Sequence, residues 1–353
     1  MSEPVTDPSQ SPAISVIIVN WNRRDLLRAC LNSVVSQVRV QPEIIVVDNC
    51  SDDGSPDMVA AEFPEIRVIR NPENRGFCAA NNQAIRLANG KFLALLNNDA
   101  EADPNWLAEL VAAFQDRPRV GMAASKILVH ADPRRIDKVG HLIWPDGQNR
   151  GRGTGSLDVG QFDREEEVLW PDGCAAMYRK AMIDKIGGFD EDFFAYADDA
   201  ELGLRARITG WTCVYRPSAI VRHHRGATLG VANPYRVTLI ERNRVLLVAK
   251  LFPWSLLWLN GYYYLWRLFA GARASIEGRG ETAVFPGVRG KWRLAKAMLK
   301  GDLDALRLIP RMLRKRAEIE RIRKLSPADT KRLILAHRIS LEELATQAAV
   351  VND

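Results

Sequence analysis

Short apolar runs alternate with amphipathic segments over the first hundred residues. The runs at 14–19 and 43–47 consist mainly of Val and Ile and predict buried strands. Near-continuous apolar strands alternating with helices predict an α/β domain, with a mostly parallel central sheet covered on both faces. Two further strands are predicted at 66–70 and 91–96, and helices at 24–37, 56–62 and 77–89.

All four predicted strands end in asparagine or aspartate. Ligands of parallel sheets bind beyond the carboxyl ends of the strands, so we expect a polar site at this edge. Turn chemistry alone explains such residues after any single strand, but four in succession favour a site. No GxGxxG pattern follows the first strand, which argues against a dinucleotide-binding domain. The side chains concerned are Asn20, Asn22, Asp48, Asn49, Asn71, Asn97, Asn98 and Asp99.

The acidic stretch 187–202 is a second candidate for chemistry, because it places six carboxylates within twelve residues. These acids are interspersed with Phe, Tyr and Leu, which a solvated acidic tail would lack. Acids held beside apolar groups indicate a site enclosed by apolar side chains, where burial can shift the pKa of a carboxylate toward a value that suits proton transfer. The alternative is a helix start at which acids are favoured by the helix dipole.

Residues 129–165 show little periodicity and are too long for an ordinary connection. We therefore expect a mobile loop or an insertion over the site. The glycine-rich run 151–155 does not match a GxGxxG cradle, so it does not indicate phosphate binding.

The chain changes character after about residue 240. Residues 251–266 contain six Trp or Tyr and no charged side chain. A helix of that length covers about 24 Å, short of the ~30 Å hydrocarbon core, so we expect an interfacial segment rather than a spanning one. A buried helical hairpin on the catalytic domain is the alternative. Residues 289–324 follow with 13 Lys or Arg against 4 Asp or Glu, which favours contact with anionic lipid.

The net charge of +6 is concentrated in that basic segment, and the rest of the chain is net acidic, which argues against nucleic acid as a partner. Five scattered cysteines without a CxxC pair suit reduced thiols in the cytosol. The polar N-terminus lacks the apolar core of a signal peptide. The predicted organisation is a disordered lead-in at 1–12, a catalytic domain at 13–240, a helical membrane-associating region at 241–325 and a C-terminal helix or tail at 326–353.

Taken in order, seven motifs resemble those of family 2 glycosyltransferases of the GT-A fold, over about residues 13–230. The resemblance is strongest to the rhamnosyltransferase-like enzymes of bacterial polysaccharide biosynthesis. Each motif alone is weak, whereas the ordered set is specific. The motifs are VIIVNWN at 16–22, IVVDN at 45–49, NRGF at 74–77, LLNND at 95–99, GGFDE at 187–191, YADDAEL at 196–202 and HHRGAT at 223–228.

The resemblance implies that a nucleotide-diphosphate sugar binds at the strand ends. Asp48 would accept the imide hydrogen of uracil or thymine, with Asn22 beside it. Arg75 would meet phosphate at a helix start, where Gly76 permits close backbone approach. A surface salt bridge is the alternative for Arg75. The remaining donor-side residues implied by the resemblance are Asn74, Asn97 and Asn98.

The resemblance also implies a divalent metal, Mn²⁺ or Mg²⁺, held by Asp99 and His223. Such cations prefer oxygen ligands and bridge to diphosphate oxygens, which neutralises the leaving group. Asn97 stands at the first position of the family's metal motif, so this site has one carboxylate instead of two. His223 begins the family's His-x-x-Gly-x-Ser/Thr pattern at 223–228, and an imidazole ligand favours Mn²⁺. An ordinary loop histidine is the alternative for His223, and His224 is its rival as ligand.

For the acidic stretch, the resemblance implies that Asp199 removes the proton from the acceptor hydroxyl in a single inverting displacement. Neighbouring acids and apolar walls raise the pKa of a carboxyl group, which suits a general base. Asp198 and Glu201 are expected to orient the acceptor or position the base, with Arg205 paired to one of them. The remaining acceptor-side residues are Trp170, Asp172 and Tyr196.

Together these inferences predict an inverting, metal-dependent glycosyltransferase. It would move a sugar, with rhamnose the first candidate, to a hydroxyl of a lipid-linked saccharide in cell-surface polysaccharide synthesis. Its expected place is the cytoplasmic face of the inner membrane, as a peripheral protein on anionic lipid. A sugar nucleotidyltransferase is the alternative, although residues 20–24 are not the glycine-rich phosphate loop of that class. A catalytically silent scaffold is a third possibility, against which the joint presence of Asp48, Asp99, Asp199 and His223 argues.

Overall fold

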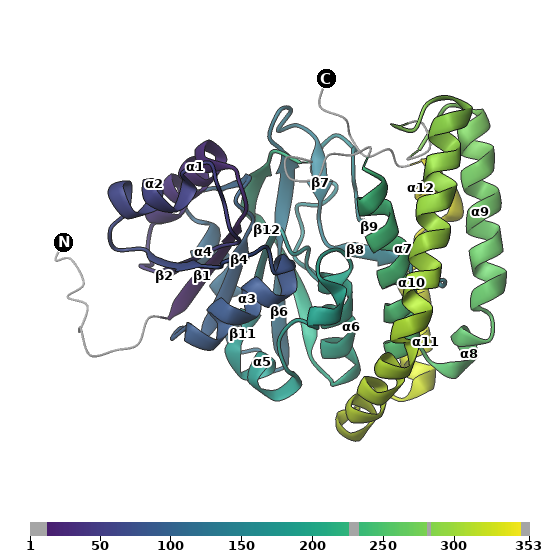
Figure 1. Ribbon diagram of the computed structural model, residues 1–353. Helices are drawn as coiled ribbons and strands as arrows, with labels where there is room; N and C mark the ends of the chain where they lie inside the picture. Colours follow the sequence, from purple (N-terminus) through teal and green to yellow (C-terminus); the bar gives the residue numbers. More distant parts are fainter. Residues whose placement is uncertain (1–12, 226–232, 281–283, 347–353) are drawn as a thin grey trace.

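The computed structural model describes residues 13–225, 233–280 and 284–346 of the chain. Figure 1 shows a central twisted sheet with helices on both faces, and long helices stacked along one side. The predicted lead-in at 1–12 and the last residues of the predicted tail, 347–353, lie outside the described residues.

A mixed sheet forms the centre of the protein. Its strands are β1 (Ile14–Asn20), β2 (Glu43–Asp48), β3 (Arg67–Arg70), β4 (Phe92–Leu96), β5 (Ala100–Ala102), β6 (Val120–Val129), β7 (Ile136–Lys138), β10 (Glu166–Val168), β11 (Ala175–Arg179) and β12 (Thr212–His223). Across the sheet the order is β10-β12-β6-β11-β4-β1-β2-β3, with β5 on β12 and β7 on β6. β1 pairs in parallel with β2 and β4, and β2 with β3, so their carboxyl ends meet at one edge. The predicted strands are confirmed to within one residue at either end.

Helices cover both faces of the sheet, as predicted. The helices of this domain are α1 (Arg24–Val35), α2 (Ser55–Glu62), α3 (Gly76–Leu87), α4 (Trp106–Ala112), α5 (Lys180–Ile186), the 3-10 turn η1 (Glu191–Phe193) and α6 (Asp198–Ile208). Apolar residues of α1, α2 and α4 form one core with the sheet, and those of α3, α5 and α6 form the other. Because β1 is buried on both faces, its side chains are apolar almost throughout.

The predicted insertion at 129–165 contains short strands. β7 extends the main sheet, and β8 (His141–Ile143) pairs with β9 (Asn149–Gly151) as a separate hairpin. The low periodicity of this segment reflects strands of only three residues, too short to produce a visible alternation.

The C-terminal region is helical, as predicted, and packs against the catalytic domain. Its helices are α7 (Pro234–Leu251), α8 (Trp254–Leu257), α9 (Asn260–Ile276), α10 (Gly287–Ile322), α11 (Pro327–Ala336) and α12 (Leu341–Thr346). α10 lies along α7, closely enough that a Cβ on Gly301 would stand 2.5 Å from the carbonyl oxygen of Thr238. The predicted boundary at 240 falls inside α7, whose Leu246 and Leu247 belong to the main core. In the described part of the chain no helix is both long and apolar enough to cross a membrane.

Candidate active site

The carboxyl ends of β1 and β2 form a rigid polar corner around Asp48. The register places Asn20 beside Asp48, and Asn20 Nδ2 donates to Asp48 Oδ1 at 3.0 Å. Ser51 donates to the same carboxylate twice, from Oγ at 2.6 Å and from its backbone N–H at 2.9 Å. Asn98 Nδ2 donates to Asn20 Oδ1 at 2.7 Å, which links this corner to the end of β4. Asp48 is therefore buried, and its carboxylate accepts these three hydrogen bonds at a position set by the sheet.

The other residues predicted on the donor side lie around this corner. Asn22 adopts a left-handed backbone (φ 48°), donates its N–H to Ser51 Oγ at 2.8 Å and accepts from the Asp52 N–H at 2.9 Å. Asn74 Oδ1 accepts from the Gly76 N–H at 2.9 Å. Arg75 precedes α3 and is exposed, so its guanidinium is open to solvent at a helix start.

Gly76 is required by its conformation and by its neighbour. Its φ is +79°, and a Cβ there would lie 2.4 Å from the ring of Phe194. The backbone carbonyl of Gly76 accepts from Asn49 Nδ2 at 3.2 Å, which ties the start of α3 to the end of β2. The NRGF motif thus holds a helix N-terminus next to the Asp48 corner.

Asp99 and His223 come together at the end of β4 and β12, as predicted. His223 Nε2 lies 3.3 Å from Asp99 Oδ1, and His223 Nδ1 lies 2.7 Å from Asp137 Oδ2. Burial lowers the pKa of His223, but the carboxylates of Asp99 and Asp137 outweigh it and raise that pKa well above its ordinary value. Burial raises the pKa of Asp99, but the charge of His223 outweighs it and leaves that pKa below its ordinary value.

This pair fits a divalent cation. Asp99 Oδ1 is a buried carboxylate oxygen without a hydrogen-bond partner among the described residues. Asp137 accepts from one imidazole nitrogen of His223, which leaves Nε2 to act as the ligand once it has lost its proton. Asn97 is half-buried, and its backbone N–H donates to the Cys174 carbonyl at 2.8 Å. Gly226 and Thr228 of the HHRGAT motif lie outside the described residues.

Asp199 lies at the start of α6, in contact with a second group of charged residues. His141 Nε2 lies 3.3 Å from Asp199 Oδ2 and 2.8 Å from Asp172 Oδ2. Lys138 Nζ donates to the same Asp172 oxygen at 2.6 Å. The Gly173 N–H lies 3.3 Å from Asp199 Oδ2, and the Ala200 N–H donates to Oδ1 at 2.7 Å. Lys138 thus contacts Asp172, and the His141 imidazole links Asp172 to Asp199.

The pKa values of the carboxyl groups in this cluster are shifted in different directions. Burial and the neighbouring charge of Asp199 raise the pKa of Asp198 well above its ordinary value. Burial also raises the pKa of Asp199, although His141 and Lys138 oppose that shift. In Asp172, burial is outweighed by Lys138 and His141, and the pKa falls well below its ordinary value. Asp199 is therefore a carboxylate with a raised pKa beside the Lys138–Asp172 ion pair.

Trp170 and Tyr196 frame this cluster in different ways. Trp170 is fully buried and stacks on the His141 ring, with centroids 6.0 Å apart and an interplanar angle of 24°. It therefore supports His141 and is not open to an acceptor. Tyr196 is half-buried with a left-handed backbone (φ 69°), and its ring faces the Arg236 guanidinium at 5.6 Å.

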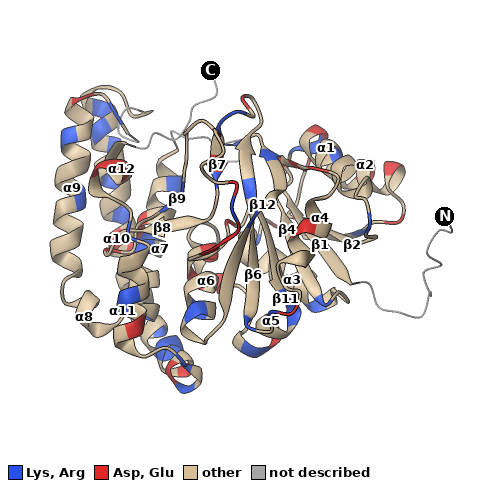
Figure 2. Cartoon of the chain, turned by 180° about the vertical axis from the view of Figure 1, so that it is seen from behind, with Lys and Arg blue, Asp and Glu red and all other residues tan. Residues whose placement is uncertain are grey.

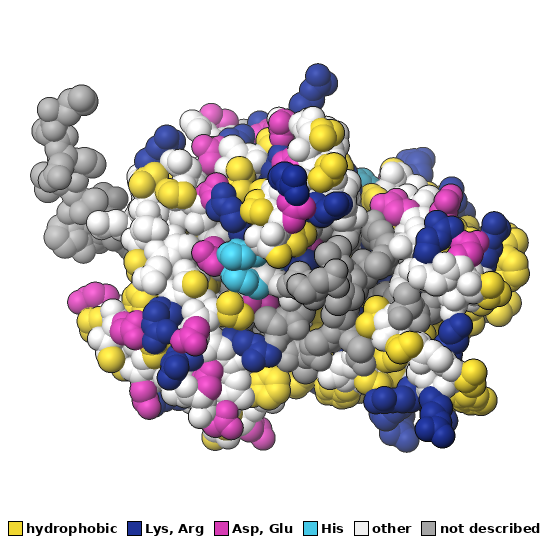
Figure 3. Space-filling view, turned by 90° about the horizontal axis from the view of Figure 1, so that it is seen from above, with side chains coloured by type: hydrophobic (Ala, Val, Ile, Leu, Met, Phe, Trp, Pro, Cys, Tyr) yellow, Lys and Arg dark blue, Asp and Glu magenta, His cyan; other side chains and the backbone are white. Residues whose placement is uncertain are grey.

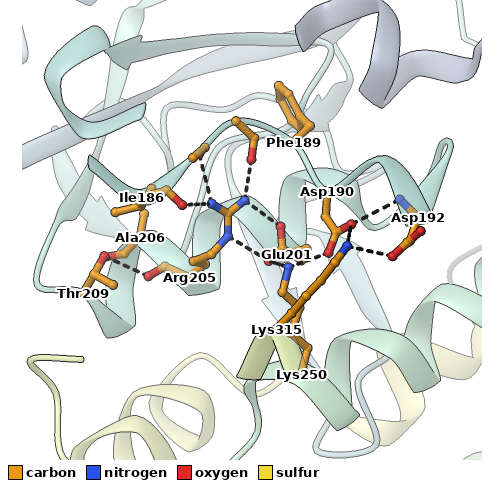
Figure 4. A network of polar contacts seen from close by, with 12 residues as sticks. Ile186, Phe189, Asp190, Asp192, Glu201, Arg205, Ala206, Thr209, Lys250 and Lys315 are labelled. Atoms are coloured by element: carbon orange, nitrogen blue, oxygen red, sulfur yellow. Dashed lines mark hydrogen bonds and ion pairs between the residues drawn. The ribbon is translucent and has the colours of Figure 1, made fainter. Parts of the chain in front are cut away.

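Glu201 is not brought to this cluster. Its carboxylate has no exposed surface and contacts Arg205 Nε at 2.8 Å and Lys250 Nζ at 2.7 Å. Lys250 also reaches Asp190 Oδ2 at 2.5 Å, and Lys315 of α10 contacts Asp190 and Asp192. Figure 4 shows this network, which connects α6 with α7 and α10. The expected pairing of Arg205 with one of the acids is confirmed for Glu201, whose position is that of a structural residue.

Three residues of the two groups escaped the sequence reasoning: Asp137, Lys138 and His141. All come from the insertion at 129–165, within the short stretch 136–141. Their only signal is a pair of charges set between apolar residues, in IDKVGH. Because β7 alternates its faces, Asp137 reaches His223 whereas Lys138 reaches Asp172. Two consecutive residues therefore connect the Asp99 pair with the Asp199 cluster.

A further cluster, Glu101, His130 and His224, lies at the surface, and Figure 3 shows histidine side chains exposed on that face. Both Nε2 atoms approach Glu101 Oε1, at 3.2 Å from His130 and 3.0 Å from His224. The two rings stack with centroids 3.6 Å apart and an interplanar angle of 21°. The cluster is therefore held together by contacts of both imidazoles with Glu101 and by stacking of the two rings.

The comparison with known families agrees with this geometry. The profile described as glycosyl transferase family 2 matches residues 15–187, which include the Asp48 corner, the start of α3 and Asp99. Residues 15–187 belong to glycosyltransferase family 2. The match ends before Asp199 and His223, whose roles rest on the geometry above and on the motif resemblance.

Two curated relatives show the range of similarity. The O-antigen biosynthesis protein RfbC of Myxococcus xanthus is 30% identical over 234 residues, covering 62% of this chain and 18% of that protein. The N-acetylglucosaminyl-diphospho-decaprenol L-rhamnosyltransferase of Mycobacterium tuberculosis is 25% identical over 242 residues, covering 62% of this chain and 78% of the enzyme. The chain thus spans less than a fifth of RfbC, although it spans most of the rhamnosyltransferase.

Solved structures confirm the GT-A fold. The mannosyltransferase PcManGT from Pyrobaculum calidifontis, in complex with GDP-Man and Mn²⁺, superposes with a TM-score of 0.52 at 20% identity, covering 90% of this chain and 87% of that chain. GalNAc-T7 with UDP, GalNAc and Mn²⁺ superposes with a TM-score of 0.51 at 17% identity, covering 60% of this chain and 43% of that chain.

Proposed function

We propose that this protein is an inverting glycosyltransferase that uses a nucleotide-diphosphate sugar. The observation that carries the proposal is the position of Asp199, a partly exposed carboxylate with raised pKa, connected through Asp137 and Lys138 to the Asp99–His223 pair. An acceptor base near a cation-binding pair is the arrangement that a displacement at an anomeric carbon needs.

In the proposed reaction, Asp199 takes the proton of an acceptor hydroxyl as its oxygen attacks the anomeric carbon. The bond from that carbon to the diphosphate oxygen breaks, and the electron pair leaves with the diphosphate. A divalent cation, bound by Asp99 and His223, would supply the positive charge that stabilises this leaving group. Asp48 would accept from the base of the nucleotide, while Arg75, Gly76 and Asn74 would face its phosphates at the start of α3.

We further infer a role in polysaccharide synthesis on a lipid-linked saccharide, with rhamnose as the first candidate sugar. The support is the similarity to an O-antigen biosynthesis protein and to an L-rhamnosyltransferase whose named acceptor is a diphospho-decaprenol. The test is a panel of dTDP-rhamnose, UDP-sugars and GDP-sugars, assayed for hydrolysis and transfer with and without Mn²⁺. Turnover of one donor by the wild type, lost in Asp199→Asn while donor binding persists, is the expected result. Unchanged turnover in that variant would refute the base assignment.

The C-terminal helices support attachment to a membrane surface. The inner side of α9 is docked, since Trp144 Nε1 donates to the Tyr263 carbonyl and Arg267 pairs with Glu241. Its outer side exposes a stripe spaced at helical intervals, and α10 exposes a second one. The exposed residues are Trp258 just before α9, Tyr262, Leu265 and Phe269 on α9, and Trp292, Leu299, Leu303 and Leu306 on α10.

Basic side chains on the C-terminal helices also support attachment to a membrane surface. Lys and Arg recur along α10 (Figure 2), where they lie on the same helix as its exposed apolar side chains. The alternative of a buried hairpin fits Leu251, Phe252 and Leu256, which are buried in the core, and in part Leu257 and Tyr263, which pack against it. Vesicle flotation tests this proposal: binding should require anionic lipid and fall in Trp258→Ser with Phe269→Ser. The matched control is Val159→Ser, an exposed apolar residue of the insertion. Equal binding to neutral vesicles, or an equal loss in the control, would refute it.

A further inference from the structure

Several titratable side chains surround the Asp199 carboxylate. Five titratable groups face it from five segments of the chain: Lys138 on β7, His141 on β8, Asp172 before β11, Tyr178 on β11 and Asp198 on α6. Tyr178 is buried and its hydroxyl has no hydrogen-bond partner among the described residues, so it contributes no charge. Burial and the charge of Asp199 raise the pKa of Asp198 well above its ordinary value. Asp172 and Lys138 form an ion pair beside the base, with Lys138 Nζ 2.6 Å from Asp172 Oδ2.

The contacts among these neighbours are specific. One oxygen of Asp172, Oδ2, receives both Lys138 Nζ at 2.6 Å and His141 Nε2 at 2.8 Å, while the other accepts from the Cys174 N–H at 2.9 Å. Lys138 is the cation in contact with Asp172, and His141 is the group in contact with both Asp172 and Asp199. Lys138 thus supplies the positive charge that compensates the Asp172 carboxylate.

His141 joins this ion pair to the base. Its Nε2 is shared between Asp172 and Asp199, while Nδ1 is buried without a hydrogen-bond partner among the described residues. A single N–H at Nε2 satisfies both carboxylates, and Trp170 fixes the plane of the ring. The imidazole therefore determines where the Asp199 carboxylate points.

We propose that Lys138, Asp172 and His141 are positioning residues, which hold the Asp199 carboxylate toward the acceptor and balance the charge around it. The proposal rests on the proposed function, because it assigns a role to these residues only if Asp199 is the base. It goes beyond that function in assigning the insertion at 129–165 a part in the chemistry.

The proposal predicts shifts of opposite sign. Lys138→Met leaves the Asp172 carboxylate uncompensated, which raises the pKa of Asp199, so the acid limb of the pH–rate profile moves to higher pH. Asp172→Asn removes that negative charge but keeps the acceptor for the Cys174 N–H, so the limb moves to lower pH. A unit charge within a few ångströms of a carboxyl group shifts its pKa by about one unit or more. The double variant, which removes both charges, should return near the wild-type value.

The experiment combines kinetics with a direct measurement. The pH dependence of kcat/KM is recorded with the donor that the sugar-nucleotide panel identifies, and ¹³C NMR of aspartate carboxyl carbons follows the Asp199 resonance, identified by its loss in Asp199→Asn. Lys180→Met is the matched control, since it removes a lysine paired with Asp184 at 3.1 Å on the surface. It should leave both readouts unchanged. For His141, the Gln variant can place an N–H near the position of Nε2 and should restore more activity than the Asn variant.

The outcomes are distinguishable. Shifts of the same sign in Lys138→Met and Asp172→Asn, or no shift in either, would overturn the inference, because a purely structural role predicts loss of kcat without opposite displacements. If the wild type turns over no donor, the proposed function fails. The NMR titration still tests the charge balance in that case, because it needs no substrate.

Discussion

Replacing Glu201 by glutamine should destabilise the protein without changing its chemistry directly. Glu201 is the common partner of two buried cations, with Arg205 Nε at 2.8 Å, Arg205 Nη2 at 2.8 Å and Lys250 Nζ at 2.7 Å. Removing one partner from a buried ion pair costs about 3–5 kcal/mol, because the remaining charge stays buried and uncompensated.

The structure places the expected cost at the lower end of that range. After the substitution Lys250 keeps Asp190 at 2.5 Å, and Arg205 keeps the Gly187 carbonyl at 3.0 Å. We therefore expect a loss of about 3 kcal/mol in the free energy of unfolding. Lys250→Met in the Glu201→Gln background should cost less than it does alone, by roughly 1–3 kcal/mol, because the two residues share one network.

Urea unfolding followed by circular dichroism measures both quantities. Asp184→Asn is the matched control, because it removes an acid from an exposed pair, for which ~0.5 kcal/mol or less is expected. The reasoning would be refuted if Glu201→Gln kept wild-type stability but raised KM for the acceptor. That result would place Glu201 in the acceptor site, as the motif resemblance implies.

Three further predictions concern the site and its surroundings. Asp99→Ala should abolish the Mn²⁺ dependence of donor binding in calorimetry, because the site has no second carboxylate from its motif; unchanged Mn²⁺ dependence would exclude Asp99 as a ligand. Gly76→Ala should weaken donor binding and cost roughly 1–3 kcal/mol of stability, since its φ is +79° and the new methyl group would overlap the Phe194 ring; wild-type values of both would contradict the close approach at α3. Among the five cysteines, Cys50 is exposed and the others are buried, so a native thiol titration should modify one thiol per chain rapidly and none in Cys50→Ser. Rapid reaction of two or more would contradict the core packing.

The sequence predicted the four strands and three helices of the first hundred residues accurately because its signals are local. A strand buried on both faces must be apolar throughout, and the runs at 14–19 and 43–47 show this without any tertiary information. The polar strand ends at Asn20 and Asp48 follow from the same register, since parallel strands meet at one edge. The meeting of Asp99 with His223, over 120 residues apart, was predicted from motif order.

The tertiary structure decided which acids of the stretch 187–202 face the site, because that depends on the helices packed above it. α7 and α10 supply Lys250 and Lys315, which draw Asp190, Asp192 and Glu201 into a structural network. The base keeps other partners, Lys138 and His141, which come from strands too short to leave a periodic pattern. Residue spacing along one chain segment determines its fold, whereas the partners of a buried charge are determined by what distant segments bring beside it.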